Sequence, residues 1–123
     1  MFKTQNKTQN SKRYDLAERT FLFAKRAMRY FKMLPPTAEN REIAKQGIRA
    51  VGSIGANYLE AEEALSKKDF VMRIKISRKE AKEAIYWLRL SEPQGINENE
   101  RYALMQEATE LMKIFGSIVE KSK

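Results

Sequence analysis

The cationic side chains between residues 66 and 92 are the groups of this sequence best suited to bind a ligand. They recur at intervals of three, four and seven residues, so a helix through this segment places them along one side. Tyr86 lies among them and offers an aromatic ring for stacking. Lysine and arginine on one face, together with such a ring, are typical of surfaces that contact a nucleic-acid backbone. The alternative is an ordinary solvated helix surface. The set consists of Lys68, Lys75, Arg78, Lys79, Lys82 and Arg89.

A second cationic set lies nearer the N-terminus and consists of Lys25, Arg29 and Lys32, with Phe21 beside it. We expect it to add to the same nucleic-acid-binding surface. The net charge of +8 is concentrated in the two segments that carry these sets. Residues 1–34 carry 9 basic and 2 acidic groups, and residues 66–92 carry 8 basic and 4 acidic groups. A membrane-surface role suits this pattern less well, because both cationic segments also have apolar core faces.

The acidic side chains do not predict an active site. The clusters formed by Glu60, Glu62 and Glu63 and by Glu80 and Glu83 invite comparison with di-iron helical bundles. Those bundles use Glu-x-x-His pairs, and the sequence has no histidine. It has no cysteine either, which excludes disulfides, thiolate chemistry and zinc sites of the Cys/His kind. We therefore expect no catalytic residue, no metal and no cofactor, and we expect Glu80 and Glu83 to pair with nearby lysine or arginine.

Three glycines, Gly47, Gly52 and Gly55, fall inside a segment that otherwise has a helical pattern. A phosphate-binding loop would place its glycines between a strand and a helix and would continue with Gly-Lys-Ser/Thr, and the sequence has neither feature. Each interior glycine costs about 1 kcal/mol relative to alanine, so some contact must offset the loss. We expect a neighbouring helix to approach these positions closely.

The elements that carry these residues are four helices joined by short loops. Residues 1–13 are expected to be a disordered basic arm, and residues 14–123 a single domain. The second helix is expected to run to about Leu65. Because no alternating pattern is long enough for a strand, the sequence predicts an all-α, antiparallel up-down four-helix bundle. The expected N-caps of the helices are Asp15, Thr37, Ser66 and Asn97.

Apolar residues at intervals of three and four define one core face for each helix. The expected faces are Leu16, Thr20, Phe23, Ala27, Phe31 and Leu34; Ile43, Gly47, Ala50, Ile54, Tyr58 and Ala61; Phe70, Ile74, Ser77, Ala81, Ile85 and Leu88; and Met105, Ala108, Leu111, Met112, Phe115 and Val119.

The second and third helices also carry small or apolar residues outside these faces. Apolar surface that a lone bundle leaves wet predicts an interface between copies of the chain. The alternative is that these residues pack inside one bundle, with Trp87 covering the helix ends. The expected interface residues are Ile48, Gly52, Gly55, Ala56 and Leu59, and Met72, Ile76, Trp87 and Leu90.

Four short segments together resemble one known family. They are SIGANYLEA at residues 53–61, KKDF at 67–70, KEA at 79–81 and YWLRL at 86–90. They are similar to segments of the four-helix-bundle proteins encoded in 23S rRNA intervening sequences, the S23 ribosomal protein family, and the likeness covers about residues 14–120. We interpret the matching positions as packing and interface residues. These positions are Ser53, Gly55, Asn57, Glu60, Glu80, Glu83, Tyr86 and Trp87.

The resemblance implies an antiparallel bundle, a homopentamer and binding of RNA or DNA. The family resembles in turn the accessory variability protein of diversity-generating retroelements, a basic, barrel-like pentamer that binds nucleic acid and a reverse transcriptase. We therefore expect a cytoplasmic, non-enzymatic, ring-like homo-oligomer that has no membrane span and binds nucleic acid, RNA above all, with little sequence preference. The alternative is an adaptor whose basic surface docks an acidic protein, such as a reverse transcriptase or a ribonucleoprotein component.

Overall fold

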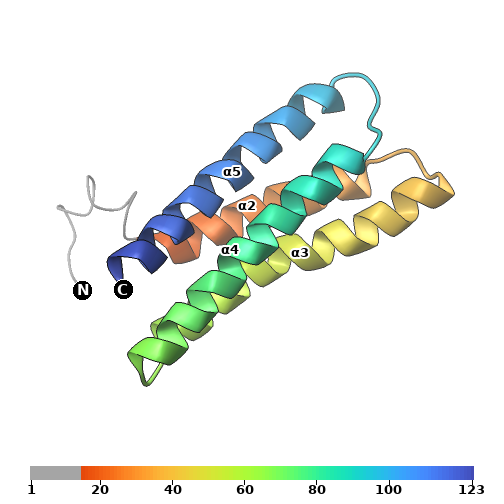
Figure 1. The fold of residues 1–123 in the computed structure, drawn as a ribbon. Coiled ribbons are helices and arrows are strands. Elements are labelled where there is room, and N and C mark those ends of the chain that lie inside the picture. The colour runs from red at the N-terminus through yellow and green to blue at the C-terminus, as the bar shows by residue number, and fades with distance from the viewer. Residues whose placement is uncertain (1–14) are drawn as a thin grey trace.

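The computed structural model describes residues 15–123, and within this range the chain is all-α. Figure 1 shows that successive helices run in opposite directions, as expected for an up-down bundle. The second of them ends shortly before the expected position near Leu65. The arm expected at residues 1–13 lies outside the described residues. The helices are α2 (Leu16–Lys32), α3 (Ala38–Glu62), α4 (Lys67–Leu90) and α5 (Asn97–Lys121).

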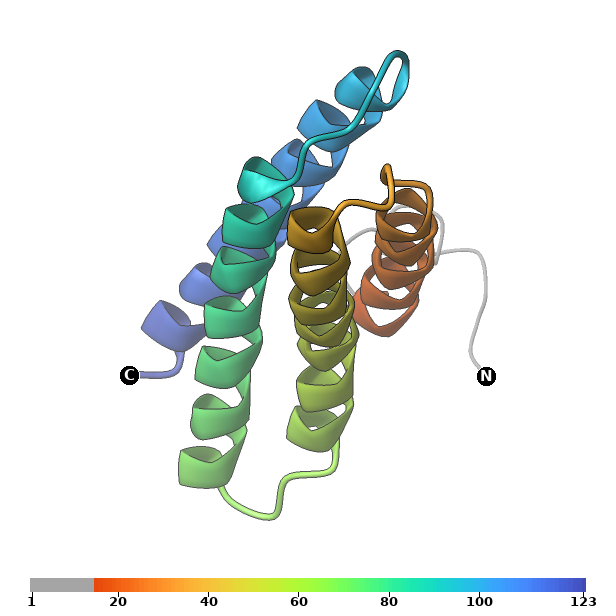
Figure 2. The same cartoon turned by 90° about the vertical axis from the view of Figure 1, so that its right-hand side faces the viewer.

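Each helix packs against the helix that follows it in the chain. The contact between α3 and α4 is the most extensive, and the contact between α2 and α5 is the smallest. Within the described residues, the backbones of the diagonal pairs α2 and α4, and α3 and α5, stay apart, and these pairs meet only through side chains in the core, such as the rings of Tyr58 and Phe115 with centroids 6.2 Å apart. Figure 2 shows the α3–α4 pair between α5 on one side and α2 on the other. The outward faces of α2 and α4 therefore point to opposite sides of the bundle. None of the helices in this part of the chain has the length and apolarity that crossing a bilayer requires.

Two bidentate ion pairs connect α2 to α5, where the helices contact each other least. Arg19 donates to the two carboxylate oxygens of Glu107 at 2.7 and 3.0 Å, and Arg26 donates to those of Glu100 at 2.6 and 2.8 Å. The hydrogen bond from Arg26 lowers the pKa of Glu100 below its ordinary value. All four side chains are partly exposed, so solvent screens the pairs and each contributes about 1 kcal/mol or less.

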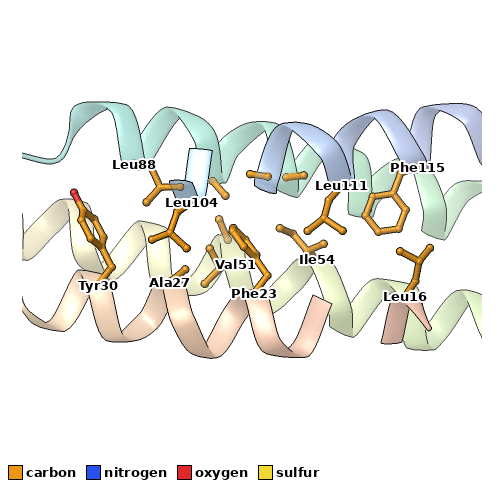
Figure 3. Close-up of a cluster of buried hydrophobic side chains, with 14 of the residues drawn as sticks. Leu16, Phe23, Ala27, Tyr30, Val51, Ile54, Leu88, Leu104, Leu111 and Phe115 are labelled. Carbon is orange, nitrogen blue, oxygen red and sulfur yellow. The ribbon is translucent and has the colours of Figure 1, made fainter. Parts of the chain in front are cut away.

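The buried side chains of all four helices meet in one core, part of which Figure 3 shows. The expected faces form this core, and a few of their members are only partly buried. The structure also buries Tyr30, Val51, Ala84 and Leu104, which the sequence analysis did not assign to the core. Each of the four is next in the chain to an expected core residue. A helix buries a face wider than one row of side chains, so residues beside the expected row are also enclosed. The partly buried members are Ile43, Tyr58, Phe70, Ile85, Met105 and Met112.

Two of the four expected N-caps are confirmed. The hydroxyl oxygens of Thr37 and Ser66 each accept a hydrogen bond of 3.0 Å from the backbone N–H of the third helical residue. Asp15 precedes α2 but forms no such bond, because its backbone is not in the extended conformation that aims an N-cap side chain at the helix. The assignment of Asn97 is wrong: Ile96 occupies the cap position with helical backbone angles, so the preceding turn leads directly into α5.

Hydrogen bonds connect the α2–α3 loop to the α4–α5 loop at one end of the bundle. The buried Asn40 donates to the carbonyl oxygens of Pro35 and Glu92 at 3.1 and 3.2 Å and accepts from the N–H of Glu92 at 3.1 Å. The hydroxyls of Tyr30 and Ser91 lie 2.7 Å apart in the same region. These buried polar groups satisfy one another, which accounts for their position inside the fold.

The close helix approach expected at the glycines is confirmed at two positions. A Cβ atom added at Gly47 would overlap the ring of Phe31, and one added at Gly55 would lie 2.8 Å from Thr20 Oγ1. Both neighbours belong to α2, so the approach occurs between α2 and α3 of the same chain.

Candidate nucleic-acid interface

The cations predicted on the 66–92 segment lie along the outward side of α4. Arg78 is partly buried beside α5, and the other five are exposed. The buried residues of α4, which include Ile74, Ala81 and Leu88, occupy the opposite side of the helix. With a rise of about 1.5 Å per residue, the five exposed cations extend over about 30 Å. We call these five residues the cationic row: Lys68, Lys75, Lys79, Lys82 and Arg89.

No member of the cationic row forms an ion pair with another described residue. The four ion pairs found within residues 15–123 use Arg19, Arg26, Arg101 and Lys123 as their cations. The row therefore presents exposed positive charges that have no ion-pair partner in the described part of the chain, and Glu83 is the acidic group that lines a hollow with two of them, Lys79 and Lys82. Such a surface attracts a polyanion, because the polyanion replaces the counterions and relieves the repulsion between neighbouring lysines.

The expectation that Glu80 and Glu83 pair with a lysine or arginine is wrong. Neither forms an ion pair within the described part of the chain. Glu80 is buried, and its Oε1 atom has no hydrogen-bond partner among these residues. Burial, and next the charge of Glu83, raise the pKa of Glu80, although the charges of Lys79 and Arg49 oppose the shift. Among residues 15–123, no group of three or more acidic side chains is arranged to hold a metal ion.

Tyr86 continues the line of the cationic row and is 55% exposed. Its ring meets that of Trp87 edge to face, with the ring centroids 5.1 Å apart and an interplanar angle of 77°. Both aromatic residues line a shallow, open hollow together with Lys79, Lys82 and Glu83. Trp87 is partly buried and packs against the core, so it supports the exposed tyrosine ring from one side.

The second cationic set lies on the opposite side of the molecule. Lys25, Arg29 and Lys32 are exposed on α2, which lies diagonally across the core from α4. The ammonium group of Lys25 lies 5.7 Å from the ring centroid of Phe21. The nine cations that the sequence analysis placed on one surface therefore occupy two surfaces. Periodicity within each helix does not show this, but the predicted up-down bundle does, because its first and third helices lie diagonally across the core.

Four of the five expected interface residues of α3 line a groove between α2 and α3. Gly52 and Gly55 line its floor, the exposed Ala56 and Leu59 lie along its α3 side, and Ile48 is partly buried against the core. The groove has a volume of about 330 Å³. We call it the α2–α3 groove. Its other lining residues belong to α2 and are Ala17, Thr20, Phe21, Ala24, Lys25 and Met28.

The α2 side of this groove was not predicted as an interface from the sequence. Phe21 was noted only as a neighbour of basic residues, yet it is 55% exposed and borders the α2–α3 groove. The signal that could have revealed it is its large apolar side chain outside the core face of its helix.

The expected interface residues of α4 do not form one patch. Met72 and Leu90 are 46% and 43% exposed, whereas Ile76 is partly buried and Trp87 packs against the core. The groups on α3 and α4 are also separate from each other, because the α2–α3 groove faces away from the outward side of α4.

Comparison with known proteins identifies the family. A sequence profile described as "23S rRNA-intervening sequence protein" matches residues 12–117. The chain belongs to this family. Its fold is similar to a crystal structure of a protein of unknown function from the S23 ribosomal protein family of Bacteroides thetaiotaomicron, with 32% sequence identity and a TM-score of 0.72. The match covers 85% of this chain and 94% of that one. No curated protein matches the chain.

In this member of the 23S rRNA-intervening sequence family, several motif residues have structural contacts. Asn57 donates to the carbonyl oxygen of Ser53 at 2.9 Å and accepts from Arg73 of α4 at 3.1 Å, which connects α3 to α4. Gly55 meets α2, and Trp87 packs against the core. These contacts agree with the interpretation of such positions as packing residues. The relation to the retroelement accessory protein stays a prediction.

Proposed function

We propose that this protein binds nucleic acid, with RNA as the expected ligand, through the cationic row of α4, and that it does so without catalysing a reaction. The observation that carries the proposal is the row itself, a line of exposed cations of which none is paired within the described residues. Phosphates that contact such cations release condensed counterions, which makes the interaction favourable and strongly salt-dependent.

The composition of the row favours contact with phosphates over reading of bases. Four of its five members are lysines, whose ammonium groups act as mobile point charges. Sequence is read mainly by side chains that form bidentate hydrogen bonds to base edges, and phosphate contacts carry no direct sequence information. We therefore expect little sequence preference.

The proposal includes a homo-oligomer, with a ring of five copies as the expected form. Support comes from the α2–α3 groove, where exposed Phe21 and Leu59 border a floor of small residues. Another copy of the chain can cover this apolar surface. A ring would repeat the cationic row in every copy, so that individually weak phosphate contacts add through multivalency.

A salt titration with a fluorescent single-stranded RNA tests the nucleic-acid proposal. The test variant replaces Lys75, Lys79 and Lys82 by Gln. For single strands, each phosphate contact contributes about −0.7 to the slope of log affinity against log salt, so loss of three contacts should flatten the slope by about 2. The matched control replaces the exposed Arg29, Lys32 and Lys113 by Gln, which changes the net charge equally at residues that neither belong to the cationic row nor line the α2–α3 groove.

Two outcomes would contradict this assignment. If the two triple variants flattened the salt slope equally, RNA binding would depend on the net charge of the protein and not on the position of the row. Absence of binding by the wild-type protein at low salt would remove the nucleic-acid function. A complex with one acidic protein that the Lys75, Lys79 and Lys82 variant fails to form would then support the adaptor alternative instead.

A further inference from the structure

We infer that the cationic row takes single-stranded nucleic acid and that an unpaired base stacks on the ring of Tyr86. This inference rests on the proposed function and goes beyond it, because it specifies the strandedness of the ligand and a base-binding position.

The first observation is the exposure and support of the Tyr86 ring. It is 55% exposed, and the edge-to-face contact with Trp87 restricts its orientation. A ring that is held in place loses little conformational freedom when a base stacks on it. Aromatic rings on basic surfaces are common binding positions for bases, because every base has a π-face.

The second observation is the distribution of charge around that ring. Lys82 and Lys79 precede Tyr86 by about one and two helical turns, and Arg89 follows it by about one turn. Phosphates can therefore contact cations on both sides of the ring. Glu83 lines the same hollow, and its carboxylate disfavours a phosphate at that point. The hollow beside Tyr86 thus suits an uncharged base, while the backbone follows the lysines.

The third observation is the shape of the surface. The cationic row is a single line of charges on the outward side of one helix, and it therefore fits one backbone. In a duplex, base faces are covered by neighbouring base pairs and are closed to an aromatic side chain. An unpaired base can turn out of the strand and stack at no such cost. The structure therefore favours a single strand over a duplex.

Binding measurements with one RNA strand, alone and annealed to its complement, test this inference at low salt. We expect the single strand to bind more tightly. Tyr86→Ala should weaken binding of the single strand by about tenfold or more and should leave binding of the duplex unchanged. Tyr86→Phe keeps the stacking ring and should bind as the wild-type protein does. Leu22→Ala is the control for the loss of an exposed apolar side chain, because Leu22 is 54% exposed on α2, diagonal to α4, and should leave binding of both RNAs unchanged.

Tryptophan fluorescence provides an independent measurement. Trp87 is the only tryptophan in the sequence and contacts Tyr86, so a base stacked on Tyr86 should change its emission. The single strand should produce this change, and the Tyr86→Ala variant should lose it.

The outcomes separate this inference from the proposed function. If Tyr86→Ala binds the single strand as well as the wild-type protein does, while the Lys75, Lys79 and Lys82 variant loses affinity, stacking is wrong and the phosphate interface stands. If the duplex binds as tightly as the single strand, the preference for single strands is wrong. If the wild-type protein binds neither RNA, both proposals are wrong.

Discussion

Replacement of glycine by alanine should lower the stability of the fold at Gly47 and raise it at Gly52, although both glycines lie in α3. At Gly47 a Cβ atom would overlap the ring of Phe31, which is 2% exposed and enclosed by the core. At Gly52 the nearest atom would be Met28 Cε at 3.6 Å, an ordinary contact. Glycine lowers the helix propensity at both positions. At Gly47 the close packing of Phe31 offsets this loss, and at Gly52 no comparable contact does.

We expect Gly47→Ala to lower the free energy of unfolding by about 1–3 kcal/mol, because the added methyl group overpacks the contact. Gly52→Ala should raise it by up to about 1 kcal/mol through the higher helix propensity of alanine. Urea denaturation followed by circular dichroism measures both. The two variants are controls for each other, since the propensity gain is the same in each. Equal effects would show that the contact with Phe31 does not constrain Gly47.

The features of each helix that depend on residues close together in the sequence could be predicted, and those that depend on contacts between distant residues could not. The core faces follow from residue intervals, and the caps at Thr37 and Ser66 follow from their own hydroxyls, so both were predictable. The hydrogen bonds between Asn40 and Glu92 were not, because these residues are far apart in the sequence and meet only when the two loops lie side by side. The burial of Glu80 was missed for a similar reason, since it depends on how the helices pack around α4.

The buried carboxylate of Glu80 should make the stability of the packed helices depend on pH. Its pKa is raised in the folded protein by burial and by Glu83, so folding favours the protonated form. The ionised form therefore reduces stability at high pH, and stability is recovered as the pH falls through the raised pKa. We expect Glu80→Gln to be more stable than the wild-type protein by about 1 kcal/mol at neutral to alkaline pH. The difference should shrink as the pH approaches the ordinary glutamate pKa of about 4.3.

Thermal melts of both proteins over this pH range measure the effect. Glu60→Gln is the control, because Glu60 is exposed on α3 and its replacement should leave stability nearly unchanged at each pH. A stability difference between Glu80→Gln and wild type that did not depend on pH would show that the ionisation of Glu80 does not destabilise the fold.

At the scale of the whole molecule, the arrangement of the helices decides which predicted residues can act together. The cationic row lies on one helix and was predictable from its spacing alone. Its separation from Lys25, Arg29 and Lys32 follows from the diagonal positions of α2 and α4. The α2–α3 groove likewise combines residues from two helices, so only its α3 side was recognisable in the sequence.

This separation allows one molecule to use two surfaces at once. The α2–α3 groove is apolar and lies away from the outward side of α4, so a second copy can cover the groove while the cationic row stays exposed. A ring built through the groove would then carry one row per copy. The native mass in solution is the first quantity that this arrangement predicts.

We expect the wild-type protein to have a native mass that is a multiple of the 14.4 kDa chain, most simply five copies, in light scattering at micromolar concentration. Phe21→Lys should shift the mass toward a single chain, because a charged group in the α2–α3 groove loses its hydration when another copy covers it. Leu22→Lys is the matched control: Leu22 is next in the chain and 54% exposed, but it does not line the groove. A wild-type monomer at every concentration would contradict the ring. Equal dissociation of both variants would show that copies associate through charge and not through the groove.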